Sequence, residues 1–287
     1  MNGLGEEGKP ASGRPRSNLQ LRIVSAIILG LAVLLITYFG GLPFRIMSAA
    51  MAGAIFYEWC AMRSERGGGM HIALGAALLA AIMALMILGQ PASVLFLGLV
   101  GALLILALHG WATGSGFGIV AGLAYAATPT LALVHLRVDD TSGLLAILFL
   151  FAVVWTTDIM AYFTGRTFGG AKLAPSISPG KTWSGAVGGT VFAVLAGGAF
   201  TLHENAVHSV ETIALIAFIL AVVSQVGDLF ESALKRKNGV KDSSNLIPGH
   251  GGVMDRVDGL LAAALALYVL AAFLGGTDHP AQALFKF

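Results

Sequence analysis

The sequence predicts an all-α, polytopic integral membrane protein with about nine transmembrane helices. Hydrophobic residues make up 56% of its 287 residues, and the mean hydropathy is +0.83. Charged residues make up only 11%, whereas soluble domains carry about a quarter. Apolar stretches of roughly 17–25 residues, the length that crosses a bilayer, recur along the whole chain.

The first element is a polar tail, residues 1–20, rich in Gly, Pro, Arg and Ser, for which we expect disorder on the cytoplasmic side. The apolar run that follows is longer than a signal-peptide core and lacks a small-x-small cleavage site, so it predicts a retained helix. We expect N-terminal transmembrane helices over 21–142 and a catalytic transmembrane region over 143–287. The predicted segments are 21–40, 43–62, 71–89, 91–109, 115–136, 143–165, 183–202, 211–231 and 258–275.

The orientation follows from the distribution of Lys and Arg, which concentrate on the cytoplasmic side of membrane proteins. With the N-terminus inside, all of the 17 Lys and Arg residues fall in inside segments except Arg45, Arg137 and Lys286. This split places the segments 166–182 and 232–257 together on the cytoplasmic side. It predicts an inner-membrane protein whose active site faces the cytoplasm.

The segment from Ser232 to Asp258 concentrates the charged residues of the chain and reads SALKRKNGVKDSSNLIPGHGGVMDRVD. Asp228, Glu231 and Ser232 precede or open it at helical spacing, and Asp255 and Asp258 are three residues apart, so each set shares a helix face. Carboxylates suit Mg²⁺, cationic side chains neutralise phosphate oxygens, and Gly-rich loops before a helix cradle phosphates. A solvated positive-inside loop would explain the cations, but neither the acidic pairs nor the Gly-His-Gly-Gly run.

A second polar segment covers residues 155–185 and reads WTTDIMAYFTGRTFGGAKLAPSISPGKTWSG. Asp158 and Tyr162 lie four residues apart on a membrane helix, and an intramembrane Asp is by default a functional candidate. The alternative is a structural ion pair between Asp158 and Arg166. Ser178, Lys181 and Thr182 follow in a Pro/Gly-rich loop before a helix start near 183, where hydroxyls and a cation suit a phosphate group.

The run S-x-L-K-R-x-x-x-x-K-D-x-S-x-x-L-I-P-x-H-G-G-V-x-D-R-V-D resembles the signature of the phosphatidate cytidylyltransferase family, the CDP-diacylglycerol synthases. The resemblance is tightest over residues 158–258. It implies a nucleotidyltransferase of phospholipid biosynthesis that uses CTP and phosphatidic acid to make CDP-diacylglycerol and pyrophosphate. It also implies dependence on Mg²⁺, as one or two cations. Two positions depart from the family pattern, since members commonly carry Glu at 184 and Lys at 170, where this chain has Ser and Gly.

The motifs and the resemblance together predict three groups of site residues. The residues expected in catalysis are Asp228, Asp255, Lys241 and His250. Those expected to bind substrate are Asp158, Tyr162, Ser178, Lys181, Thr182, Ser232, Lys235, Arg236, Gly251, Gly252 and Arg256. Those expected to hold metal are Asp228, Asp255 and Asp258.

Several features carry weaker or alternative interpretations. Glycines at four-residue spacing, such as Gly185 and Gly189, favour close helix packing over a homodimer contact, which stays open. Cys60 is expected to pack in the core, and Glu58 is interpreted as a loop or cavity residue. A secondary transporter would need inverted repeats, and none is visible. A CTP-dependent lipid kinase stays open and differs by its products. The bilayer is the expected partner, and nucleic acid is not.

Overall fold

The computed structural model describes residues 18–63, 68–138, 140–203, 206–247, 251–277 and 279–285, with side chains from residue 27 onward. Over these residues the chain forms nine α-helices, one β-hairpin and two short 3-10 helices. The helices are α1 (Asn18–Phe39), α2 (Gly41–Met62), α3 (Gly69–Ile87), α4 (Ala92–Thr113), α5 (Gly118–Leu136), α6 (Thr141–Phe168), α7 (Trp183–Gly198), α8 (Val210–Lys237) and α9 (Met254–Gly275). The remaining elements are β1 (Lys172–Ala174), β2 (Ser178–Thr182), η1 (Ala199–Leu202) and η2 (Pro280–Ala283).

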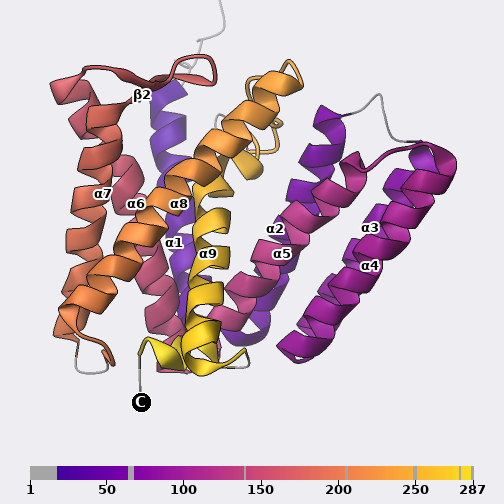
Figure 1. Cartoon of the computed structure of the whole chain (residues 1–287), viewed down its shortest axis with the longest axis horizontal. Helices are drawn as coiled ribbons and strands as arrows, with labels where there is room; N and C mark the ends of the chain where they lie inside the picture. The colour runs from indigo at the N-terminus through magenta and orange to yellow at the C-terminus, as the bar shows by residue number, and fades with distance from the viewer. Residues whose placement is uncertain are drawn as a thin grey trace, which may run out of the picture.

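Successive helices run in alternating directions between two ends of the molecule (Figure 1). We call the end that carries the β-hairpin the hairpin end, and the opposite one the far end. The chain enters α1 at the hairpin end and finishes at the far end, as nine helices of alternating direction require (Figure 1). The β-hairpin, the last turn of α8 and the first turn of α9 all lie at the hairpin end, which confirms that the two polar segments share one end.

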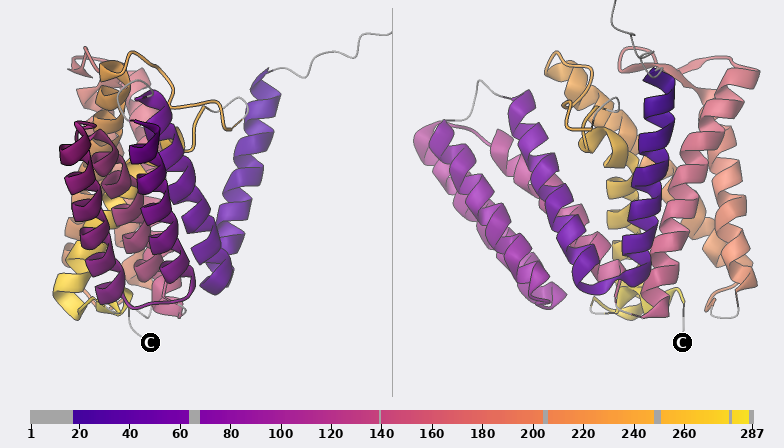
Figure 2. Two further views of the ribbon diagram at one scale, coloured as in Figure 1. Left: turned by 90° about the vertical axis from the view of Figure 1, so that its right-hand side faces the viewer. Right: turned by 180° about the vertical axis from the view of Figure 1, so that it is seen from behind.

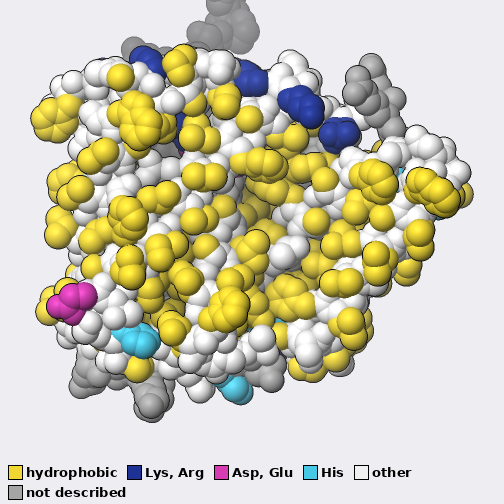
Figure 3. Space-filling model, in the orientation of Figure 1, with side chains coloured by type: hydrophobic (Ala, Val, Ile, Leu, Met, Phe, Trp, Pro, Cys, Tyr) yellow, Lys and Arg dark blue, Asp and Glu magenta, His cyan; other side chains and the backbone are white. Residues whose placement is uncertain are grey.

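The helices bear out the predicted membrane class. Seven of the described helices, α3 to α9 with α7 prolonged by η1, are long and apolar enough to cross a membrane. The apolar part of α1 with described side chains is the shorter Ile27–Phe39, and α2 carries Arg45 and Glu58. Figure 3 shows hydrophobic side chains over the middle of one face and lysines and arginines along the hairpin end. The chain is a polytopic, all-α membrane protein.

Two hydrophobic cores hold the helices together. One lies among α6, α7, α8 and α9, with contributions from α2, α5 and the C-terminal η2. The other lies among α2, α3, α4 and α5 and includes Met254 and Leu261 of α9. The hairpin of α3 and α4 stands at one side of the molecule and α7 at the other, as Figures 1 and 2 show. Helix α9 therefore joins the two cores, and its N-terminus lies between them.

Small residues let helices α6 and α7 approach closely. A Cβ added at Gly185 would come within 2.7 Å of the Ala161 carbonyl oxygen, and one at Gly189 within 2.6 Å of the Thr157 carbonyl oxygen. Contacts this short exclude any side chain. The predicted packing role of these glycines is therefore confirmed as contact within one chain.

The structure corrects the predicted ends of two helices and the form of one loop. Helix α8 continues to Lys237 instead of ending at 231, so its cations lie on its last turn, where they favour the helix dipole. Helix α9 begins at Met254 instead of 258, so Asp255 lies on the helix. The predicted loop at 172–182 is an antiparallel hairpin that pairs Lys172 with Thr182. Hydropathy predicts only the apolar part of a helix, so the polar turns at the ends of α8 and α9 were not included in the predicted segments.

Candidate active site

The two polar segments meet at an ion pair between Lys181 and Asp228. Lys181 lies on β2 and Asp228 lies on α8, 47 residues later. Their side chains are 28% and 31% exposed, so the pair is partly shielded from water. The strand presents Lys181 because the hairpin folds back over the end of α6 and passes directly into α7. Thr182 ends this strand and caps α7 by accepting a hydrogen bond from the Gly185 amide at 3.1 Å.

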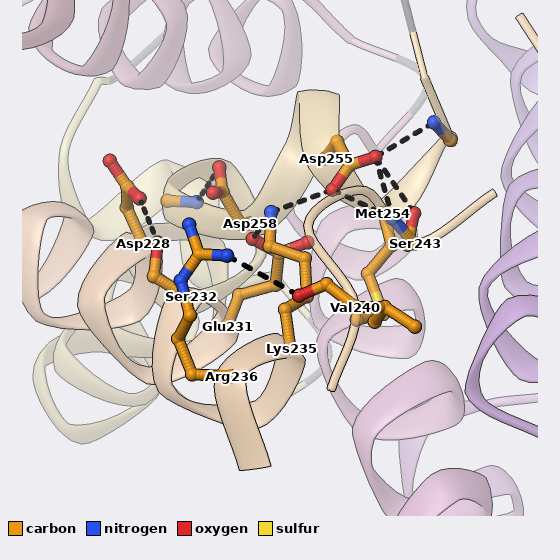
Figure 4. Close-up of polar contacts among 12 residues, drawn as sticks. Asp228, Glu231, Ser232, Lys235, Arg236, Val240, Ser243, Met254, Asp255 and Asp258 are labelled. Carbon is orange, nitrogen blue, oxygen red and sulfur yellow. Dashed lines mark hydrogen bonds and ion pairs between the residues drawn. The ribbon is translucent and has the colours of Figure 1, made fainter. Parts of the chain in front are cut away.

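Further polar side chains surround Asp228. The Ser232 hydroxyl donates to its Oδ1 at 3.4 Å from the next turn of α8. The carboxylates of Asp158 on α6 and Asp258 on α9 lie near enough to interact electrostatically with Asp228. Asp158 also interacts electrostatically with the Lys181 ammonium. Figure 4 shows Asp228 and Asp258 on neighbouring helices. Residues from α6, β2, α8 and α9 thus form one cluster, as the sequence predicts. Asp158 therefore belongs to this cluster. Arg166, the alternative partner of Asp158, donates a hydrogen bond to the Tyr162 hydroxyl at 3.0 Å.

A second ion-pair group lies beside the first. The Lys235 ammonium is 2.7 Å from Glu231 Oε2, one turn earlier on α8, and 2.7 Å from Asp255 Oδ1 on α9. Glu231 is fully buried. A single lysine therefore joins two carboxylates and two helices, as seen in Figure 4. Two carboxyl groups and one lysine therefore meet in a largely buried place.

Asp255 also organises the loop that leads into α9. It accepts hydrogen bonds from the Ser243 amide at 3.0 Å, the Ser243 hydroxyl at 3.0 Å and the Gly252 amide at 2.8 Å. Gly251 has a φ of +82°, a left-handed conformation that glycine adopts at no steric cost. A Cβ at Gly252 would collide with Ser243 Oγ. Gly251 is thus favoured by its backbone conformation, and Gly252 is required because the loop is tightly packed around it.

The other predicted residues lie at the rim of this cluster or beyond it. The Arg236 guanidinium donates to the Ile177 carbonyl at 3.3 Å, which ties α8 to the turn of the hairpin. Lys241 and Arg256 are exposed, and Tyr162 is exposed on α6. Ser178 opens β2. His250 lies outside the described residues. The structure therefore brings most of the predicted set together and leaves Lys241, Arg256 and Tyr162 at its edge.

The two departures from the family pattern have structural explanations. The Ser184 hydroxyl donates to the Gly169 carbonyl and is 3.1 Å from the Thr182 hydroxyl, so it ties the start of α7 to the end of α6. Gly170 has a φ of +96°, which disfavours any other residue there.

The three predicted metal ligands do not have equivalent surroundings. The carboxylates of Asp228 and Asp258 lie near enough, on α8 and α9, to interact electrostatically. Asp255 is turned toward Lys235 and the amides of its own loop. No group of three or more His, Cys, Asp or Glu within the described ranges has the arrangement of a metal site. The donors at Asp228 and Asp258 fit a hard cation such as Mg²⁺, which favours oxygen ligands and binds through one or two carboxylates.

Comparison with known proteins agrees with this arrangement. Residues 20–274 match the model of the cytidylyltransferase family. The chain belongs to the cytidylyltransferase family. It is 46% identical over 271 residues to the phosphatidate cytidylyltransferase of Brucella suis biovar 1 (strain 1330), covering 94% of this chain and all of that protein. The phosphatidate cytidylyltransferases of Haemophilus influenzae and Bacillus subtilis are each 44% identical, over 46% and 48% of this chain and 48% and 52% of their own.

Three residues of this cytidylyltransferase site were not among the site residues predicted from the sequence. Glu231 was noted only for its helical spacing, although it is the buried partner of Lys235. Ser243 holds Asp255 from within the loop. Glu58 comes from α2 and reaches the same loop. The carboxylate within the apolar run that follows Arg45 in α2 was the signal that could have drawn attention to Glu58.

Proposed function

We propose that this protein transfers a cytidylyl group from CTP to phosphatidic acid and releases CDP-diacylglycerol and pyrophosphate. The observation that carries this proposal is the ion pair between Lys181 and Asp228, which brings the two polar segments into one cluster at the hairpin end. The family assignment and the names of the relatives support the same activity.

The chemistry requires an oxygen of the lipid phosphate to attack the α-phosphorus of CTP. The bond between that phosphorus and the oxygen bridging to the β-phosphate breaks, and pyrophosphate leaves with the electron pair. A phosphate monoester has a second pKa of about 6, so the nucleophile is largely ionised at neutral pH. The protein therefore needs to neutralise charge and align the reactants more than it needs a general base.

The cations of the site are arranged for such neutralisation. Lys181 and Lys235 each sit against a carboxylate within the cluster. Arg236 and Lys241 lie exposed toward the surrounding solvent. We assign Lys181 and Lys235 to the reacting phosphates and the outer pair to capture of the triphosphate. Ser178 and Ser232 are assigned to hydrogen bonds with phosphate oxygens.

Mg²⁺ is part of the proposal, with Asp228 and Asp258 as its protein ligands. A bound Mg²⁺ would supply positive charge that stabilises the reacting phosphates. Asp255 is the third candidate, and the hydrogen bonds that it accepts from Ser243 and Gly252 hold it at the start of α9. Asp158 would orient Lys181 from α6.

A groove on the outside of the helices suits the lipid substrate. An apolar groove of about 580 Å³ runs between α7 and α8, lined by residues that include Trp183, Val187, Phe218 and Val226. Its lining includes Trp183, two residues after Lys181, and Leu229, which follows Asp228 in the sequence. We propose that an acyl chain of phosphatidic acid occupies this groove while its phosphate reaches the ion pair.

The proposed location is the inner membrane, with the hairpin end on the cytoplasmic side. Described lysines and arginines cluster at this end, whereas Arg45 and Arg137 lie near the far end. This distribution follows the positive-inside rule. It also places the site where CTP is available.

The proposal is tested by incubating the purified protein in detergent micelles with CTP, phosphatidic acid and Mg²⁺. We expect pyrophosphate and a CDP-lipid in equal amounts. Formation of CDP and a phosphorylated lipid would instead identify a CTP-dependent lipid kinase. Omitting Mg²⁺ and adding a chelator tests the metal assignment separately.

A further inference from the structure

Glu58 is a carboxylate of the N-terminal half that lies outside both polar segments. It stands in the last turns of α2, and none of its surface is exposed. Neither the motif nor the predicted site includes it. A buried carboxylate is costly unless hydrogen bonds or a cation compensate its charge, so its partners reveal its role.

All four hydrogen bonds that the structure gives Glu58 come from the loop and helix start over 243–254. The Ser244 hydroxyl and the Val253 amide donate to Oε1 at 2.6 Å and 2.8 Å. The Met254 amide and the Ser243 hydroxyl donate to Oε2 at 2.7 Å and 3.2 Å. Both carboxylate oxygens are therefore occupied by a segment about 190 residues away in sequence.

These contacts give α9 a cap from another helix. The N-cap residue of α9 is Val253, whose side chain cannot accept a hydrogen bond, so the first amides of the helix need an outside acceptor. Glu58 accepts from the amides of Val253 and of Met254, the first helical residue, and places a carboxylate at the positive end of the helix dipole. Asp255 accepts from the Gly252 amide. The carboxylates of Glu58 and Asp255 thus accept hydrogen bonds from three successive backbone amides, those of residues 252–254.

Ser243 connects the two carboxylates directly. Its hydroxyl has a single proton, which is shared between Glu58 Oε2 at 3.2 Å and Asp255 Oδ2 at 3.0 Å. A Cβ at Gly252 would meet both Ser243 and Glu58, so the loop packs against this carboxylate without room for a side chain. The position of Asp255, and of Asp258 one turn later, therefore depends on α2.

We propose that Glu58 is a positioning residue that fixes the first turn of α9, and thereby Asp255 and Asp258, against α2. The inference rests on the proposed function for its effect on catalysis. It makes the N-terminal helices part of the active-site framework. Glu58 touches no reacting group itself and acts through the loop that it holds.

The test compares Glu58→Gln with the wild-type full-length protein in detergent micelles. The amide side chain keeps the shape but offers one acceptor oxygen where the carboxylate has two. We expect faster hydrogen–deuterium exchange in peptides that cover 251–258, with unchanged exchange in α6. We also expect kcat to fall about tenfold to a hundredfold, the range for lost hydrogen bonds to a charged group, with a smaller change in KM for CTP.

Two further variants sharpen the test. Ser244→Ala removes one donor to Glu58 and leaves the carboxylate, so it should fold normally and lower kcat about threefold to tenfold. Tyr57→Phe changes an exposed neighbour on α2 and should alter neither exchange nor kcat.

Unchanged exchange over 251–258 in Glu58→Gln would overturn the proposal. So would faster exchange throughout the bundle with an unchanged kcat for the folded fraction, because this is the behaviour of a residue that only stabilises the fold. If the wild-type protein made no CDP-lipid, the proposed function would fail, whereas the exchange measurement would still decide whether Glu58 holds the loop.

Discussion

Replacing Lys235 by Met should destabilise the protein strongly, because it leaves two carboxylates without their shared cation. The side chains of Lys235, Glu231 and Asp255 are only 12%, 0% and 7% exposed. Asp255 keeps its hydrogen bonds from Ser243 and Gly252, whereas Glu231 has no other ion-pair partner among the described residues. Breaking a buried pair from one side costs about 3–5 kcal/mol, so we expect a loss of this size in the free energy of unfolding.

A compensating change separates stability from activity. In the double variant Lys235→Met/Glu231→Gln, the unpaired buried charge is gone, so more than half of the lost stability should return. Activity should not return, because Lys235 is also assigned to the reacting phosphates. The free energy of unfolding is measured by titration with SDS in mixed micelles, and CDP-lipid formation is measured on the same samples. A double variant no more stable than Lys235→Met would refute the electrostatic reasoning, and recovered activity would limit Lys235 to a structural role.

Three further changes test separate parts of the account. Lys241→Ala should raise KM for CTP about tenfold to a hundredfold through loss of one charged phosphate contact, and unchanged kinetics would leave it a positive-inside residue. In a Cys60→Ser background, cysteines at positions 175 and 245 should both be labelled by impermeant reagent from the cytoplasmic side; labelling from opposite sides would contradict the topology. Val187→Trp should fill the groove between α7 and α8 and raise KM for phosphatidic acid about tenfold, which corresponds to the usual cost of overpacking. A rise in KM for CTP alone would argue against the groove.

The positions of the helices could be predicted from the sequence because the bilayer imposes one dominant requirement. Every membrane segment must be apolar and about 20 residues long, so all nine predicted segments correspond to helices over the described residues. The polar ends of these helices follow different rules. The last turn of α8 is cationic and the first turn of α9 is acidic, and both are helical because charge there is compatible with the helix dipole.

The partners of the site residues could be predicted only in part. Spacing along a helix brought Asp228 and Ser232 onto one face, and the structure agrees. Pairing across segments, such as Lys181 with Asp228, depends on how α6, α7 and α8 pack, which no local pattern specifies. Glu58 was the hardest to predict, because its partners follow about 190 residues later and its own surroundings in the sequence are apolar.

The account also predicts how the acidic residues act together. Asp228→Asn and Asp255→Asn should each abolish CDP-diacylglycerol formation while the protein still inserts and folds. The double variant should be little worse than either single one, because residues that act as a unit have non-additive effects. Independent, multiplicative losses would show that the two carboxylates serve separate sites.

The most direct test of the account follows the α-phosphorus of CTP in wild-type protein and in Asp228→Asn. The matched control is Glu211→Gln, which removes an exposed carboxylate at the opposite end of the same helix. With CTP labelled at the α-phosphorus, the account predicts labelled lipid from the wild type and from Glu211→Gln, and none from folded Asp228→Asn. Unlabelled lipid from the wild type, or equal labelling by Asp228→Asn, would contradict it.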